Sequence, residues 1–180
     1  MKRVTGTVLF GAGLVVGAAL TLLPRVPLMA KSEAAQPSSL AARVQELEDH
    51  IAIERLLMQY GVALDSRDFA TYSQLFAREG TWSGSIGTFK GPAAIKEAME
   101  KAFKSDKPGP NGTFHLLTNP IIQVHGDHAT ALSKWTFCRT AGATPALVLA
   151  GNYEDTFVRE DGVWKFSSRN ATQTTTVAAK

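Results

Sequence analysis

Residues 113–141 read TFHLLTNPIIQVHGDHATALSKWTFCRTA, and this stretch decides the fold. It contains two long runs rich in β-branched and aromatic residues, separated only by a Gly-Asp pair at 126–127. Such a pair between two such runs is typical of a tight turn between antiparallel strands. Two more runs follow at 147–159 and 163–172, with an Asp-Gly pair at 161–162. The C-terminal half therefore predicts four long strands joined as an antiparallel meander.

Helical patterning dominates the sequence before this meander. Ser39 and Asp68 are suitable N-cap residues, and Pro92 suits the first turn of a helix. A short hairpin is expected across Gly84. The spacing of apolar residues and these signals predict three helices, over residues 40–64, 69–76 and 93–104.

Helices followed by an antiparallel meander are typical of the α+β class. We expect a strongly curved antiparallel sheet packed against the three N-terminal helices, which makes a cone-shaped domain over residues 40–175. A cone of this kind encloses an internal pocket, and concave apolar cavities are the usual sites for small ligands.

The first 30 residues have the pattern of a targeting or anchoring segment. Lys2 and Arg3 form a basic start, and residues 4–23 contain no charged side chain. This order matches a secretory signal peptide, and the uncharged run also has the ~20 residues that a membrane-spanning helix needs. A cleaved signal and an uncleaved membrane anchor both remain open. Either one predicts an exported domain, periplasmic or anchored facing outward, with residues 31–39 as a polar linker.

Charge and cysteine content exclude two further classes. The formal net charge of +3 equals the contribution of Lys2, Arg3 and Arg25, so residues 31–180 sum to zero. A nucleic-acid-binding domain carries a basic patch or stripe, so we expect no nucleic-acid partner. The single cysteine, Cys138, excludes an intrachain disulfide and is expected to be a small buried apolar side chain.

Several motifs follow one another in a recognisable order: IERLL at 53–57 with Tyr60, ALDSRDF at 63–69, LF at 75–76, GTFKG at 87–91, HLLTNP at 115–120 and GVWKF at 162–166. In this order the chain resembles the SnoaL-like group of the nuclear-transport-factor-2-like superfamily. The resemblance implies the cone-shaped α+β fold. Its relatives include polyketide cyclases, ketosteroid isomerase, scytalone dehydratase and bile-acid dehydratase, and also subunits without chemistry of their own. Because one fold hosts many activities, the resemblance implies the fold more specifically than the function.

The resemblance also implies a catalytic trio. In dehydratases of this superfamily, a Tyr and an Asp on the first helix meet a His on the first long strand, and Tyr60, Asp65 and His115 match those positions. A carboxylate beside an imidazole fixes its tautomer and makes it a better base, and a phenol can donate a proton. Structural alternatives stay open for each: Asp65 closing a turn, Tyr60 in the core, and His115 as a hydrogen-bonded residue of a half-buried strand.

Further pocket residues are expected on the hairpin and the sheet. We expect Trp82, Cys138, Thr140 and Tyr153 to line the pocket. Lys134 either faces it, where an amine can hold an anionic group, or is a solvated surface lysine. Scytalone dehydratase has a second pocket His with no counterpart near Thr140, and Tyr153 stands where it has a pocket Asn. We therefore expect a different substrate.

The leading interpretation is a cofactor-independent lyase acting on a small, largely apolar or aromatic hydroxylated molecule. Acid/base elimination would remove water or a small aldehyde. An isomerase with the same base and a non-catalytic small-molecule-binding protein are the alternatives. No cluster of His, Cys and carboxylates has metal-ligand spacing, so we expect neither a metal nor a cofactor. We also expect a homo-oligomer, a dimer or a trimer.

Overall fold

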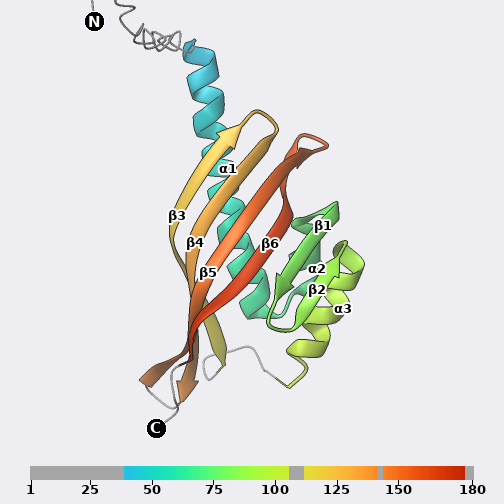
Figure 1. The fold of residues 1–180 in the computed structure, drawn as a ribbon, viewed down its shortest axis with the longest axis vertical. Helices are drawn as coiled ribbons and strands as arrows, with labels where there is room; N and C mark the ends of the chain where they lie inside the picture. Colours follow the sequence, from blue (N-terminus) through green and yellow to red (C-terminus); the bar gives the residue numbers. More distant parts are fainter. Residues whose placement is uncertain (1–38, 106–111, 142–143, 177–180) are drawn as a thin grey trace, which may run out of the picture. The chain divides into compact units, whose positions relative to one another are not determined.

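The helices and strands follow the predicted order (Figure 1). The computed structural model describes residues 39–105, 112–141 and 144–176, so the expected signal or anchor over residues 1–30 lies outside the described residues, as does the linker apart from Ser39. The elements are α1 (Leu40–Ser66), α2 (Phe69–Gln74), β1 (Phe76–Gly84), β2 (Gly87–Lys90), α3 (Pro92–Ala102), β3 (Thr113–His125), β4 (His128–Ala141), β5 (Thr144–Glu160) and β6 (Val163–Thr176). No helix in these ranges is both long and apolar enough to cross a membrane.

The six strands form one curved sheet in the order β2-β1-β6-β5-β4-β3 (Figure 1). The sheet is not closed, because β2 and β3 are its two edges. Neighbouring strands are antiparallel, except that β1 and β6 pair in parallel. Helix α1 packs on β3 and β6, whereas α3 packs on β1 and β2. The predicted α+β fold, a curved sheet against three helices, is confirmed.

Helix α1 carries clear start and stop signals. The Ser39 hydroxyl oxygen accepts a hydrogen bond from the Ala42 N–H at 3.1 Å, as expected of an N-cap. Arg67 ends the helix in the left-handed conformation with φ 61°. The first buried residue of the helix is Asp49, and the burial continues to Leu64. The C-terminal two-thirds of α1 therefore pack onto the sheet.

The boundary between α2 and β1 differs from the prediction. Helix α2 ends at Gln74, and Phe76 begins a nine-residue strand instead of ending the helix. This strand pairs with β6 through Phe76 and Phe166, and its register then shifts before Thr81. Because the pairing is distant in sequence and interrupted, local alternation did not reveal it. The hairpin turn lies at residues 85–86, since Gly84 still pairs with Gly87 in the ladder.

A bulge in β6 changes which side chains face the core. Phe157 pairs with Phe166 and Thr156 pairs with Ser168, so Ser167 is an extra residue in β6. Phe166 is buried before the bulge, and Arg169 is buried after it. The bulge therefore brings an arginine to the core face of the strand.

Candidate active site

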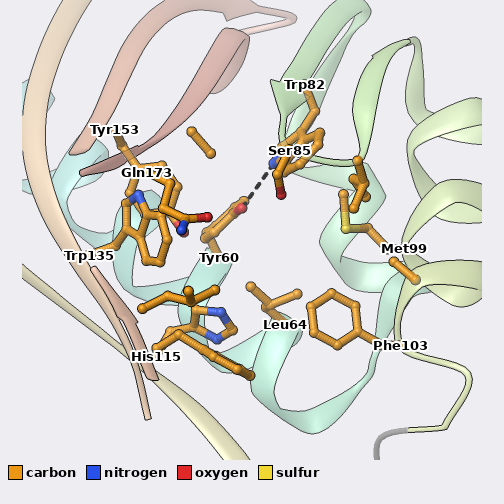
Figure 2. Close-up of a pocket in the computed structure, with 15 residues that line it drawn as sticks. Tyr60, Leu64, Trp82, Ser85, Met99, Phe103, His115, Trp135, Tyr153 and Gln173 are labelled. Carbon is orange, nitrogen blue, oxygen red and sulfur yellow. Dashed lines mark hydrogen bonds between the residues drawn. The ribbon is translucent and has the colours of Figure 1, made fainter. Parts of the chain in front are cut away.

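A cavity of about 250 Å³ lies between α1, α3 and the sheet. Figure 2 shows Tyr60 and His115 within it, with Trp135, Tyr153 and Gln173 on one side and Trp82, Met99 and Phe103 on the other. Among the described residues that line the cavity, most are apolar or aromatic and none carries a permanent charge. The lining residues are Tyr60, Leu64, Trp82, Ser85, Ile86, Met99, Ala102, Phe103, His115, Trp135, Phe137, Leu149, Tyr153, Ala171 and Gln173.

His115 and Asp65 form a hydrogen-bonded pair at the wall of this cavity. The His115 Nδ1 lies 2.7 Å from the Asp65 Oδ1, and the His115 backbone N–H donates to Oδ2 at 2.9 Å. The imidazole side chain is only 8% exposed and the carboxylate 25% exposed. A carboxylate that accepts the hydrogen on Nδ1 leaves Nε2 with a free lone pair. The geometry therefore gives His115 one nitrogen that can accept a proton.

Tyr60 contributes a polarised hydroxyl group to the same cavity. Its oxygen accepts hydrogen bonds from the Trp82 Nε1 at 3.1 Å and from the Tyr72 hydroxyl at 2.9 Å. Burial, followed by the neighbouring Tyr60, raises the pKa of Tyr72 well above its ordinary value, so Tyr72 keeps its proton and remains a donor. With two donors on its oxygen, the Tyr60 hydroxyl can donate its own hydrogen to a bound molecule.

Arg169 packs against the ring of Tyr60 without lining the cavity itself. Its guanidinium carbon lies 3.8 Å from the centroid of the Tyr60 ring and 4.0 Å from that of Tyr153. Asp155 accepts two hydrogen bonds from Arg169, at 2.8 and 2.6 Å, and both side chains are fully buried. Burial alone would lower the pKa of Arg169, but the Asp155 carboxylate outweighs this effect and raises it. A charged guanidinium thus contacts the rings of both Tyr60 and Tyr153, which line the cavity.

Residues 45–170 match the model of the family described as the SnoaL-like domain, which is more than half of the chain. The chain belongs to the SnoaL-like domain family. The individual relatives described next are less than 30% identical to this chain, and each match covers more than two-thirds of it.

Among characterised proteins, this SnoaL-like chain is similar to the gamma-hexachlorocyclohexane dehydrochlorinase of Sphingobium indicum. The two are 27% identical over 131 residues, which cover 71% of this chain and 82% of the relative. Among solved structures, an NTF2-like protein with a cystatin-like fold from Novosphingobium aromaticivorans is 28% identical with a TM-score of 0.67, covering 78% of this chain and 91% of that one. A candidate scytalone dehydratase from the same species is 26% identical with a TM-score of 0.64, covering 77% and 92%.

The SnoaL-like fold brings the expected trio together. Tyr60 and His115 line the cavity, and Asp65, which is not part of the lining, is hydrogen-bonded to His115. Trp82 and Tyr153, expected as pocket residues, also line the cavity. In the described part of the chain, no three or more His, Cys, Asp or Glu side chains gather as metal ligands.

The other three expected pocket residues do not line the cavity. The Lys134 amino group is exposed and donates to the Asn152 side chain at 2.8 Å. The Thr140 hydroxyl donates to the Gly112 carbonyl at 2.8 Å. Cys138 is buried but does not line the cavity. Burial raises the pKa of its thiol, so the thiol stays protonated near neutral pH. Side chains at odd and even positions of a strand point to opposite faces of the sheet. All three residues occupy even positions of β4, whereas Trp135 and Phe137, the β4 residues that line the cavity, occupy odd positions.

The structure also reveals residues that the sequence did not single out. Ser85 and Ile86 line the cavity because they form the turn between β1 and β2. Met99 and Phe103 reach it from α3 and the residue after it. Gln173 adds an amide group from β6. The helical period of α3 was the available signal for Met99, but nothing local marked Gln173.

Proposed function

We propose that this protein is a cofactor-independent lyase that eliminates a small leaving group from a largely apolar molecule bound in the cavity. The observation that carries the proposal is the 2.7 Å hydrogen bond between His115 Nδ1 and Asp65 at the wall of an apolar cavity. An oriented, nearly buried imidazole with a free nitrogen is suited to removing a proton from a bound molecule.

In the proposed reaction, His115 Nε2 takes a proton from a substrate carbon. The electron pair of the broken C–H bond forms a carbon–carbon double bond as the bond to the leaving group on the adjacent carbon breaks. For a hydroxyl leaving group, the Tyr60 hydroxyl donates the proton that turns it into water. The Asp65 carboxylate stabilises the imidazolium formed on His115. That proton then returns to the Tyr60 oxygen through solvent, so the net change is loss of water without any redox step.

The lining of the cavity points to the class of substrate. A site without permanently charged side chains gives no compensation for burying a charged molecule, so the substrate is neutral. The volume of about 250 Å³ lies below the ~300–1,000 Å³ that is usual for drug-sized ligands, which favours one or two rings. The rings of Trp82, Trp135 and Tyr153 offer faces for such a molecule.

The relatives support an elimination. The name dehydrochlorinase of the Sphingobium relative describes loss of hydrogen chloride. The name of the candidate scytalone dehydratase from Novosphingobium describes loss of water. Both reactions need a base for a C–H proton and a route for a leaving group. The proposal for this chain is the shared chemistry, with water as the expected leaving group and chloride as a further one to test. Loss of a small aldehyde would need His115 to take the proton of a substrate hydroxyl group while a C–C bond breaks and its electron pair goes to an adjacent carbonyl group.

The test is a panel of neutral ring compounds that carry a hydroxyl or chloride on the carbon next to an acidic C–H. It includes cyclic β-hydroxy ketones and γ-hexachlorocyclohexane, incubated with the purified full chain in the presence of a chelator. Mass spectrometry follows the loss of water or hydrogen chloride. His115→Ala removes the proposed base, and His125→Ala is the matched control because His125 is exposed at the end of β3.

Elimination by the wild-type chain and by His125→Ala, but not by His115→Ala, supports the proposal. A product of unchanged mass with a moved double bond would assign an isomerase instead. Compounds that bind in the cavity and remain unreacted would overturn the lyase and favour a small-molecule-binding protein.

A further inference from the structure

A second apolar surface runs along α1. Six large side chains on it are between 44% and 73% exposed: Leu40, Val44, Leu47, Ile51, Met58 and Val62. At 3.6 residues per turn, they fall within about 60° of the helix circumference. The buried residues of α1, such as Ile53 and Tyr60, lie on the opposite side. Helix α1 is therefore apolar on two opposite sides, and the described residues cover only one of them.

The N-terminal turns of α1 lack support from the rest of the domain. Residues 40–48 are exposed on all sides, and Figure 1 shows this part of the helix extending past the sheet. Leu40 and Leu47 are 73% and 64% exposed. Short helices are marginal in water without packing of an apolar face. A partner that covers this face would supply the missing packing.

The spacing of the exposed apolar residues at the start of α1 indicates a helical partner. Leu40, Val44, Leu47 and Ile51 are separated by four, three and four residues, which is the spacing of a coiled-coil seam. In heptad terms, Val44 and Ile51 occupy a positions and Leu40 and Leu47 occupy d positions. In parallel coiled coils, β-branched residues at a with leucine at d favour two helices over three or four. Glu54 stands at the next d position and ends the seam.

Charged residues beside the seam match a second copy of the same helix. Arg43 is at a g position and Glu48 at the e position five residues later. In a parallel pair in register, each g residue faces the e residue of the other helix, so Arg43 of one copy meets Glu48 of the other on both sides. The exposed face of this segment carries Glu46 and Glu48 against Arg43 alone, because Asp49 is buried and paired with Arg159. An acidic polar face disfavours an anionic lipid surface, which attracts Lys and Arg.

We propose that Leu40, Val44, Leu47 and Ile51, the α1 seam, form a parallel two-stranded coiled coil with a second copy of this chain. The seam lies opposite the side of α1 that packs on the sheet and that contributes Tyr60 and Leu64 to the cavity, so pairing does not involve these residues. It also brings the two Ser39 residues together at one end of the dimer.

Cysteine cross-linking of the full chain tests the seam. Leu40→Cys and Leu47→Cys each place a thiol in the seam, and Glu46→Cys is the control because position 46 is exposed away from it. The natural Cys138 is buried. Under mild oxidation we expect covalent dimers from both seam variants, at least ~10-fold more than from Glu46→Cys, because a disulfide needs Cα atoms within about 7 Å.

Other arrangements give different results. An antiparallel pair would set Leu40 beside Ile51 of the other copy, about 16 Å along the helix from the other Leu40. Leu40→Cys would then link only to Ile51→Cys, which would overturn the parallel dimer. The parallel dimer would also be overturned if the seam cysteines form no more covalent dimer than Glu46→Cys does. It would equally be overturned if the seam cysteines do not cross-link but are protected from alkylation by added detergent or lipid, because the seam would then face a lipid surface.

A charge exchange tests the orientation independently. Arg43→Glu puts like charges opposite each other twice in the dimer, and we expect it to raise the dimer dissociation constant about five-fold. The double variant Arg43→Glu/Glu48→Arg restores the pairs and should return the constant to its original value. Analytical ultracentrifugation of the full chain measures both. Equal dissociation constants for all three proteins would contradict the proposed register.

Discussion

Asp65 binds both the backbone and the side chain of His115. Its carboxylate accepts the His115 N–H at 2.9 Å and lies 2.7 Å from Nδ1, although the two residues are 50 positions apart. The pair joins the end of α1 to the start of β3. Because the carboxylate fixes the strand as well as the imidazole, the orientation of the ring is set before any molecule enters the cavity.

The first prediction concerns Asp65→Asn. An asparagine can donate its amide hydrogen to Nδ1, which would place the imidazole hydrogen on Nε2 and remove the base. We expect turnover to fall by ~10²–10⁴-fold while the melting temperature stays near that of the wild type. Steady-state kinetics and thermal unfolding measure the two effects. Normal turnover in a folded variant would show that Asp65 does not orient the base.

The second prediction separates Tyr60 from its neighbour. Tyr60→Phe removes the proposed proton donor, and we expect turnover to fall less than for Asp65→Asn, by about 10-fold, because water can partly replace a phenol. Tyr72→Phe removes only a hydrogen bond to the Tyr60 oxygen and should lower turnover by less. A larger loss in Tyr72→Phe than in Tyr60→Phe would contradict the role of Tyr60 as donor.

The sequence predicts the fold where its signals are local. The Gly-Asp turn predicts the β3–β4 hairpin and the Asp-Gly turn predicts the β5–β6 hairpin, and the structure confirms both. The start of β1 was predicted wrongly, because the strand depends on parallel pairing between Phe76 and Phe166. A partner 90 residues away leaves no periodicity in the strand itself.

The candidate site was predictable only in part for the same reason. Tyr60, Asp65 and His115 came from the resemblance, and the structure brings them together. Arg169 was missed, because strict alternation from Phe166 would turn it away from the core. The extra residue Ser167 reverses that alternation, and a bulge depends on pairing between strands.

The third prediction tests the buried ion pair of Asp155 and Arg169, which contacts Tyr60 and Tyr153. Asp155→Asn leaves the guanidinium of Arg169 buried without its counter-charge, and we expect a loss of about 3–5 kcal/mol in the free energy of unfolding. The double variant Asp155→Leu/Arg169→Met removes both charges and should recover most of this loss. Urea denaturation measures both. A cost below about 1 kcal/mol for Asp155→Asn would show that the pair is not held as described.

The fourth prediction concerns stability in acid. Burial alone would raise the pKa of Asp49, but hydrogen bonds from Arg159 at 2.6 Å and Trp164 at 3.1 Å outweigh it and lower the pKa. A carboxyl group whose pKa is lowered by folding stabilises the fold at any pH above its pKa in the unfolded chain, about 3.9. This contribution disappears as the pH falls through the lower pKa of the folded state.

We therefore expect the unfolding free energy to decrease below about pH 4, and less steeply in Asp49→Asn than in the wild type. Asp161→Asn, at an exposed turn, is the control. Urea denaturation between acidic and neutral pH gives the comparison. Identical pH profiles for the wild type and Asp49→Asn would exclude the assigned stabilisation.

The central claim is that His115 removes the proton from the substrate. The most direct test is the ratio of kcat/KM between the wild type and His115→Ala on a compound that the wild type converts, with His125→Ala as the matched histidine control. The account predicts that His115→Ala stays folded and loses ~10²–10⁴-fold, while His125→Ala keeps the wild-type value. A folded His115→Ala variant with near-normal kcat/KM would contradict it.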